Sequence, residues 1–221
     1  MDRLVLEGAP RVEVALRTSP RARRLTLRVA PDGTAVLTRP PWVARAEAAA
    51  FARSKRDWLA ARMGGAGPRR PAVGGTVPLE GAEAPVLEGP ERIEGGAFHV
   101  SGDPGPAVAR LLKARAREAL TEAAGRHAAA LGRPHGRIAL RDTRSRWGSC
   151  SAEGALSFSW RLAMAPSEVL DYVAAHEVAH LARMDHSAAY WAGLARLMPG
   201  YEAPRRWLKE HGHGLLAWDF S

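Results

Sequence analysis

The sequence predicts an α+β protein, with a β-rich N-terminal part that carries one helix and a mostly helical C-terminal part. Before residue 101, apolar and polar residues alternate in short runs, whereas from residue 106 apolar residues recur at helical spacing. A Gly- and Pro-rich segment, GGAGPRRPAVGG at 64–75, separates the two patterns. We therefore expect three parts: a β-hairpin and helix in residues 1–64, a linker with short strands in 65–105, and a larger domain in 106–221.

The N-terminal part is predicted to form a hairpin followed by a helix. Residues 24–29 and 35–38 alternate, and the Asp-Gly pair between them favours a tight turn. Residues 44–63 have helical spacing and end at two glycines. The short strand-like runs in residues 76–101 are cut by Gly and Pro and could pair with this hairpin.

The C-terminal part is predicted to combine helices with a small antiparallel sheet. Helical patterns cover residues 106–131, 167–183, 188–198 and 205–211, and residues 138–140 form a short strand. A second strand is expected over 155–162, with Leu156, Phe158, Trp160 and Leu162 on one face and Ser157, Ser159 and Arg161 on the other. An extended substrate could add beside this strand.

Composition places the chain among ordinary globular proteins of the cytoplasm. It has 221 residues, 46% hydrophobic and 25% charged, enough for one substantial domain and an appendage. A single cysteine, Cys150, excludes an internal disulfide framework and fits a reducing compartment. No signal-peptide pattern opens the chain, and no window has the apolar length of a membrane span. We expect a cytoplasmic protein without a membrane partner.

The positive charge is concentrated near the N-terminus. The whole chain carries +9, and residues 1–64 hold 13 Lys and Arg against 6 Asp and Glu, which gives that part +7. Such an excess suits an anionic partner such as nucleic acid. The alternative is compositional bias, because the sequence uses Arg far more than Lys and is rich in Ala and Gly.

The strongest functional signal is His176-Glu177-Val-Ala-His180 within the predicted helix 167–183. Residues i and i+4 of a helix point almost the same way, so His176 and His180 could bind one metal ion. Glu177 projects beside them, where it could act as a general base on water. Pro166 and Ser167 mark the helix start, with Ser167 as the expected N-cap.

A third ligand is needed, because catalytic zinc sites usually have three protein ligands and an open position. His186 follows His180 by six residues and is the first candidate. Asp185 is the alternative, either as ligand or as a residue that orients one. The remaining alternative is a helix whose surface histidines bind nothing. With His176, His180 and His186 together, the sequence predicts a Zn²⁺ site.

Three stretches resemble the YgjP-like metallopeptidase family, relatives of the SprT-like zincins. They are RSRWGSC at 144–150, LSFSWRLAMAP at 156–166, and HEVAHLARMDHS at 176–187 together with Trp191. RRLTLR at 23–28 and SKRDWL at 54–59 look like that family too, whereas residues 65–105 match it least. Asp185 stands where the family often has Asn.

The resemblance implies a zincin-like α+β catalytic domain in residues 106–221, with the three histidines on zinc and Glu177 as general base. Metal-assisted hydrolysis needs a donor for the developing oxyanion, and Arg144, Arg146 and Trp147 are candidates because they lie in the family-like turn. Their alternative role is to support that turn. Cys150 fits a small buried residue better than a nucleophile.

The sequence leaves three functions open: two hydrolases that differ in substrate, and one protein of a different functional class. The leading hypothesis is a zinc metallopeptidase that cleaves peptide bonds. The first alternative is a nucleoside triphosphate pyrophosphatase, because some members of the family are described so and arginines grip phosphates well. The second is a DNA-associated SprT-like protease or binding module that docks through the basic N-terminal part.

Overall fold

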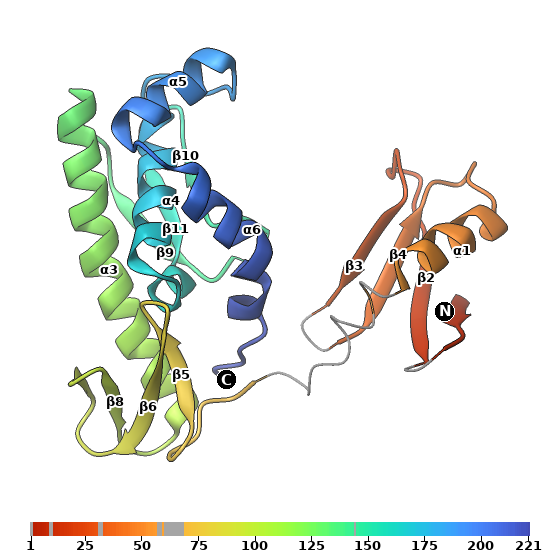
Figure 1. Ribbon diagram of the computed structural model, residues 1–221, viewed down its shortest axis with the longest axis horizontal. Helices are drawn as coiled ribbons and strands as arrows, with labels where there is room; N and C mark the ends of the chain where they lie inside the picture. Colours follow the sequence, from red (N-terminus) through yellow and green to blue (C-terminus); the bar gives the residue numbers. More distant parts are fainter. Residues whose placement is uncertain (1, 9–10, 31–32, 57–58, 60–68, 144) are drawn as a thin grey trace. The chain divides into compact units, whose positions relative to one another are not determined.

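The chain is an α+β protein, as predicted, and its elements are drawn in Figure 1. The computed structural model describes residues 2–8, 11–30, 33–56, 59, 69–143 and 145–221. The chain divides into two compact units, Met1–Arg69 and Arg70–Ser221, and each has its own hydrophobic core. No described helix is both long enough and apolar enough to cross a membrane.

The N-terminal unit is a four-stranded sheet with one helix. The strands β1 (Asp2–Leu6), β2 (Val12–Thr18), β3 (Thr26–Val29) and β4 (Ala35–Arg39) lie in the order β1-β2-β4-β3. The predicted hairpin is the antiparallel pair β3–β4, and β2 runs parallel to β4. Alternate residues of β2 are buried because one face meets α1 (Arg45–Ser54). The helix predicted over 44–63 ends at Ser54 in the structure. Most of residues 55–63 lie outside the described residues.

The C-terminal unit opens with a second sheet. Its strands β5 (Thr76–Leu79), β6 (Ala82–Glu88), β7 (Arg92–Glu94) and β8 (Ala97–Val100) lie in the order β5-β6-β8-β7. The expectation that these segments pair with the N-terminal hairpin is wrong, since the described strands of 76–100 pair only with one another. Val77, Val86 and Phe98 are fully buried and join the core of this unit.

The long helix α3 (Pro104–Leu131) forms one wall of the unit. It begins where the Asp103 side chain accepts a hydrogen bond from Gly105 N, and it ends at Gly132, whose φ of 68° is the left-handed conformation that closes a helix. Gly125 lies within α3, and a Cβ built on it would meet nothing within 4 Å.

A three-stranded sheet carries the family-like turn. Strand β11 (Leu156–Ser159) is central, parallel to β9 (Ile138–Arg141) and antiparallel to β10 (Gly148–Cys150). The predicted strand over 155–162 stops at Ser159, and a 3-10 helix, η1 (Trp160–Met164), follows. Arg161 was expected on a polar strand face but is 2% exposed. It bonds the Asp142 carboxylate and the carbonyls of Leu215 and Trp218 instead.

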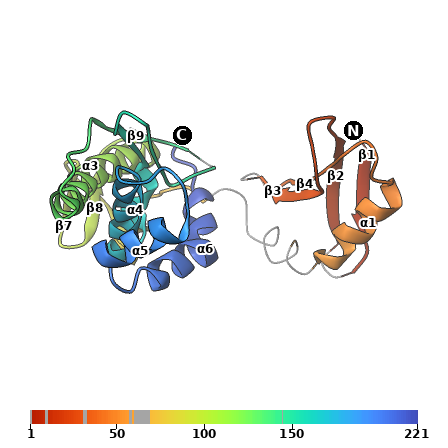
Figure 2. The same ribbon diagram turned by 90° about the horizontal axis from the view of Figure 1, so that it is seen from above.

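The remaining helices surround the predicted metal-binding helix. Helix α4 (Ser167–Ala179) lies between α3 and α6 (Glu202–Leu216), with α5 (Ala188–Leu197) beside it (Figure 2). Nine of its thirteen residues are buried, so α4 is a core helix rather than an amphipathic surface helix. Ser167 was the expected N-cap, but Pro166 takes that position and no side chain caps the helix.

Candidate metal centre

The three histidines singled out in the sequence lie together. His176 is in the last turn of α4, His180 follows directly as the capping residue, and the chain then turns so that His186 returns just before α5. Their ligand atoms all lie within 4.8 Å of one another, and the Nε2 atoms of His176 and His186 are 3.3 Å apart. The cluster therefore gathers donors from a helix end and the turn after it.

The donor set fits a tetrahedral metal ion. Two nitrogen ligands at typical zinc distances, separated by a tetrahedral angle, are about 3.3–3.4 Å apart. The His176–His186 pair has this spacing. All three donors are imidazoles, which suit zinc and several other transition metals. The residues thus fit a metal such as zinc, while the geometry of the donors does not select one metal.

His176 and His180 are held in place by different contacts. The Nδ1 atom of His180 lies 2.9 Å from the Arg183 carbonyl, so the tautomer that donates there leaves Nε2 free as a ligand. His176 Nδ1 is buried without a hydrogen-bond partner among the described residues. Its ring is instead packed among aromatic rings, with Tyr190 5.4 Å and Tyr172 5.9 Å away between centroids. The Tyr190 hydroxyl also donates to the His176 carbonyl at 2.9 Å.

Burial keeps His176 and His180 neutral and ready to bind a metal ion. Burial, followed by the charges of His180, His186 and Arg205, lowers the pKa of His176 to about 4. Burial is also the first cause that lowers the pKa of His180. Neutral imidazoles offer their lone pairs at neutral pH without first losing a proton.

Glu177 follows His176 in the chain, and its side chain is almost completely shielded from solvent. Glu177 is only 5% exposed. Burial raises the pKa of its carboxyl group to about 7, and the positive charge of Arg146 opposes this rise. A carboxyl group with a pKa close to the working pH can both accept and donate a proton. Strand β10 passes directly against it: a Cβ built on Gly148 would be 2.5 Å from Glu177 Oε1.

A comparison with known families agrees with this arrangement. Residues 103–211 match the model of the YgjP-like, metallopeptidase domain. These residues are a YgjP-like metallopeptidase domain. The match runs from the N-cap of α3 through the histidine cluster into α6. No curated protein matches the chain.

Within the YgjP-like domain, the three residues expected to stabilise an oxyanion are placed differently. Arg146 is exposed, and its charge acts on Glu177. Trp147 is half-buried and packs toward α6, where a Cβ built on Gly212 would be 2.9 Å from its ring. Arg144 lies outside the described residues. Arg146 is thus the described candidate whose charge reaches Glu177, whereas Trp147 supports the turn against α6.

Asp185, the alternative third ligand, points elsewhere. Its Oδ1 accepts hydrogen bonds from the Ser187 backbone N at 3.3 Å and from its hydroxyl at 2.8 Å, at the start of α5. Cys150 lies near Glu177, and burial followed by the Glu177 charge raises the pKa of its thiol. A raised thiol pKa makes a poor nucleophile, in agreement with the expectation that Cys150 is a small packed residue.

An aromatic layer beside the YgjP-like histidine cluster was missed in the sequence. The Trp191 ring stacks on Tyr201 at 5.7 Å, and Tyr201 stacks on Tyr172 at 6.4 Å. Arg205 lies over Trp191, with its guanidinium carbon 4.4 Å from the ring centre. Tyr172, Trp191 and Tyr201 come from three helices, so sequence spacing does not connect them. The helical periodicity of each segment indicates only that one face of that segment is buried in the core.

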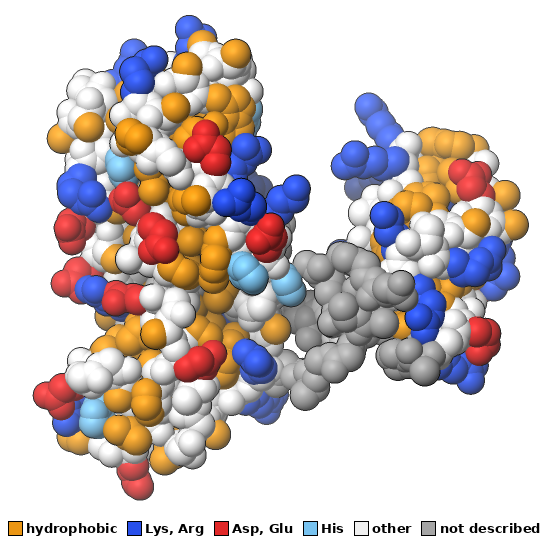
Figure 3. Space-filling model, viewed as in Figure 1, with side chains coloured by type: hydrophobic (Ala, Val, Ile, Leu, Met, Phe, Trp, Pro, Cys, Tyr) orange, Lys and Arg blue, Asp and Glu red, His pale blue; other side chains and the backbone are white. Residues whose placement is uncertain are grey.

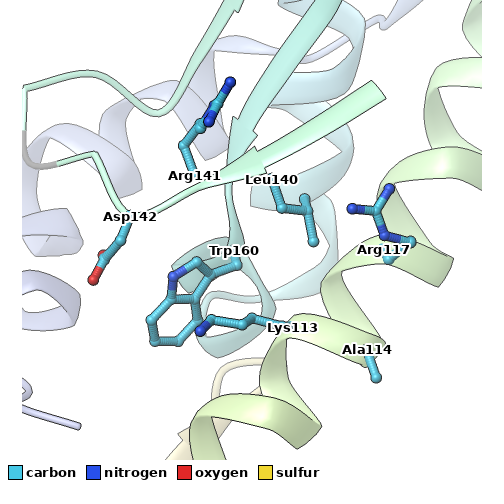
Figure 4. Close-up of a pocket in the computed structure, with 7 residues that line it drawn as sticks. All are labelled: Lys113, Ala114, Arg117, Leu140, Arg141, Asp142 and Trp160. Atoms are coloured by element: carbon cyan, nitrogen blue, oxygen red, sulfur yellow. The ribbon is translucent and has the colours of Figure 1, made fainter. Parts of the chain in front are cut away.

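A cavity of about 560 Å³ lies away from the histidines, between α3, β9 and η1. Lys113 lies across the Trp160 indole and Arg117 reaches in from α3, whereas Arg141 is directed away (Figure 4). Asp142, at its rim, is paired with Arg161 at 2.6 Å. This cavity contains none of the residues predicted for the metal site.

Proposed function

We propose that this protein is a zinc-dependent peptidase that cleaves peptide bonds with an activated water molecule. The observation that carries the proposal is the buried Glu177 carboxyl, with a pKa raised to about 7, on the residue that follows His176 in a cluster of three converging imidazoles. The membership of residues 103–211 in a metallopeptidase family supports it. His176, His180 and His186 would hold the ion, which would polarise the scissile carbonyl and acidify the attacking water.

Glu177 would move the proton in this reaction. With a pKa near the working pH, its carboxylate takes the proton from the attacking water and then passes it to the leaving amine. Gly148 keeps the space above Glu177 clear, because any side chain at that position would press on the carboxylate. Arg146 is the proposed donor to the developing oxyanion, since its charge already reaches Glu177.

The substrate is proposed to lie along β10 rather than β11. The strand after the family-like turn, β11, was expected to receive an extended substrate, but it is paired on both sides. Among the described strands β10 is at the sheet edge, and it lies against Glu177 through Gly148. Its free backbone groups can bind an extended peptide as one more strand. A hollow of about 330 Å³ adjoins its end, lined by residues 151–154 and by His180, Leu181 and Met184.

The test compares zinc-loaded wild type with Glu177→Gln on an unfolded protein mixture and on a panel of nucleoside triphosphates. The matched control is Glu168→Gln, which changes an exposed carboxylate in the first turn of the same helix. We expect peptide fragments from wild type and Glu168→Gln and none from Glu177→Gln, with equal zinc content in all three. Glu177-dependent pyrophosphate release without peptide fragments would instead identify a nucleotide hydrolase.

A further inference from the structure

Arg205 is the cation that the aromatic layer holds next to the histidine cluster. Its guanidinium carbon lies 4.4 Å from the centre of the Trp191 ring. That ring is in turn 5.7 Å from the ring of His186 and 6.0 Å from that of His176. Arg205 is therefore a neighbour of the metal cluster through a single side chain.

The nitrogen edge of Arg205 has no anionic partner among the residues that the structure describes. Several arginines of this unit form ion pairs, among them Arg70 with Asp219 and Arg126 with Asp171. Arg205 forms none with any carboxylate in the described part of the chain, and its side chain is exposed. A guanidinium that stacks by its face keeps its N–H donors available, and the stacking reduces the conformational freedom lost when an anion binds.

The surroundings favour an anionic group on the bound molecule. Arg205 on α6 lies over the Trp191 ring, and that ring is 5.7 Å from the ring of His186, so the positive charge of Arg205 is one side chain away from the histidine cluster. Lys and Arg side chains also gather on the face of this unit over α6 (Figure 3). The planar fork of Arg matches the two oxygens of a carboxylate, which gives directional as well as electrostatic selectivity.

We propose that Arg205 is a specificity-determining residue that binds a carboxylate of the peptide substrate. The carboxylate is either an acidic side chain close to the scissile bond or the free C-terminus of a peptide cut near its end. This inference rests on the proposed peptidase function and adds the class of peptide that the site prefers. The alternative role for Arg205 is structural, as a cation that only joins α5 to α6 through Trp191.

The test measures binding, so that it does not depend on turnover. The zinc-loaded full chain with Glu177→Gln is titrated with peptides that differ only in Glu or Gln at one position, each with a free or an amidated C-terminus. The same titrations are made after adding Arg205→Ala, Arg205→Lys or Arg205→Met. Arg206→Ala is the matched control, because Arg206 is the exposed neighbour on α6 and is outside the aromatic stack.

We expect the Glu177→Gln protein to bind one carboxylate-bearing peptide more tightly than its neutral counterpart, by about 10- to 100-fold. Arg205→Ala and Arg205→Met should remove this preference without changing zinc content, Arg205→Lys should keep part of it, and Arg206→Ala should keep all of it. The position of the preferred carboxylate, in a side chain or at the C-terminus, identifies its source.

Equal affinity for charged and neutral peptides in the Glu177→Gln protein overturns the inference. So does a preference that survives Arg205→Ala, or a lower melting temperature as the only effect of Arg205→Met, which is the result for a structural role. Failure of the proposed peptidase function looks different: no Glu177-dependent cleavage occurs, although peptide binding still depends on Arg205.

Discussion

Gly148 of β10 lies against Glu177 of α4 so closely that a Cβ built on the glycine would be 2.5 Å from Oε1 and 2.6 Å from Cγ of the carboxylate side chain. Contacts of this length do not occur between real side chains, so any larger residue must displace the carboxylate or the strand. The close approach to Glu177 therefore explains why this position of the family-like turn is a glycine. It lets the backbone of the edge strand approach the Glu177 side chain.

We predict that Gly148→Ala lowers peptidase activity by 100-fold or more while zinc binding is retained, an order of magnitude expected for a displaced catalytic group. Activity and zinc content are measured on the same preparation. Gly125→Ala is the matched control, because its surroundings on α3 are open. That variant should keep full activity and gain about 1 kcal/mol in the free energy of unfolding. Full activity in Gly148→Ala would contradict the assigned contact.

Metal binding should depend on all three histidines of the cluster. His186→Ala is expected to reduce zinc from one ion per chain to a small fraction, because it removes the ligand whose Nε2 faces that of His176 at 3.3 Å. His211→Ala removes an exposed histidine of α6 outside the cluster and should leave the zinc content unchanged. Zinc content is measured by elemental analysis after dialysis.

Removal of the metal should also lower thermal stability. A ligand present at about 1,000 times its dissociation constant stabilises the native state by about 4 kcal/mol. We therefore expect a chelator to lower the melting temperature of wild type and to leave that of His186→Ala nearly unchanged. A wild-type melting temperature that is unchanged by both chelator and added zinc would contradict the metal site.

The raised pKa of Glu177 predicts that the free energy of unfolding of the metal-free protein depends on pH. Its native pKa is about 7, whereas the ordinary pKa of a glutamate side chain is 4.5. Between these values the native state keeps a proton that the unfolded state has lost, so stability falls as pH rises through this window, by up to about 3 kcal/mol. His176 acts in the opposite direction, because its pKa is lowered to about 4 and the unfolded state takes up the proton first.

The difference between wild type and Glu177→Gln isolates the Glu177 contribution. In the absence of metal, the two proteins should unfold with similar free energies at pH 4. At pH 8 the Gln variant should be the more stable, because it carries no buried charge. Denaturant titrations across this range measure the difference, and a difference that does not change with pH would argue against a buried, proton-retaining Glu177.

Arg161 is predicted to be the most sensitive charged residue for folding. It is 2% exposed, and it bonds Asp142 and two carbonyls near the C-terminus. Replacing it with Ala removes the donor to the two buried carbonyl contacts, which costs about 1–3 kcal/mol for each carbonyl left unsatisfied, whereas the 46% exposed Asp142 side chain regains water. Arg92→Ala breaks the exposed pair with Glu94 and should cost less than about 1 kcal/mol. Both values come from equilibrium unfolding.

The helices and the histidine spacing could be predicted because both depend on local periodicity. Helix α3 follows the predicted limits closely, and α4 brings His176 and His180 to one face as the i, i+4 rule requires. The hairpin of β3 and β4 was predicted from its alternation.

The remainder depends on contacts between distant segments. The end of β11 at Ser159 follows from Arg161, whose partners Leu215 and Trp218 are more than fifty residues away. The edge position of β10 follows from the pairing of β11 with β9 on its other side. Arg205 and Trp191 meet because α5 and α6 pack on α4. No periodicity within a single segment contains this information.

The ion pair between Arg70 and Asp219, at 2.6 Å, joins the first residue of the C-terminal unit to a residue two positions before its last, Ser221. The backbone carbonyls of Leu215 and Trp218 are fixed by Arg161 within the same unit. The unit therefore closes on itself, and its two ends come together at one place. Such a segment can be moved as a cassette: residues 70–221 could be transferred between host chains, or relinked end to end and opened at a surface turn, without cutting through the metal-binding core.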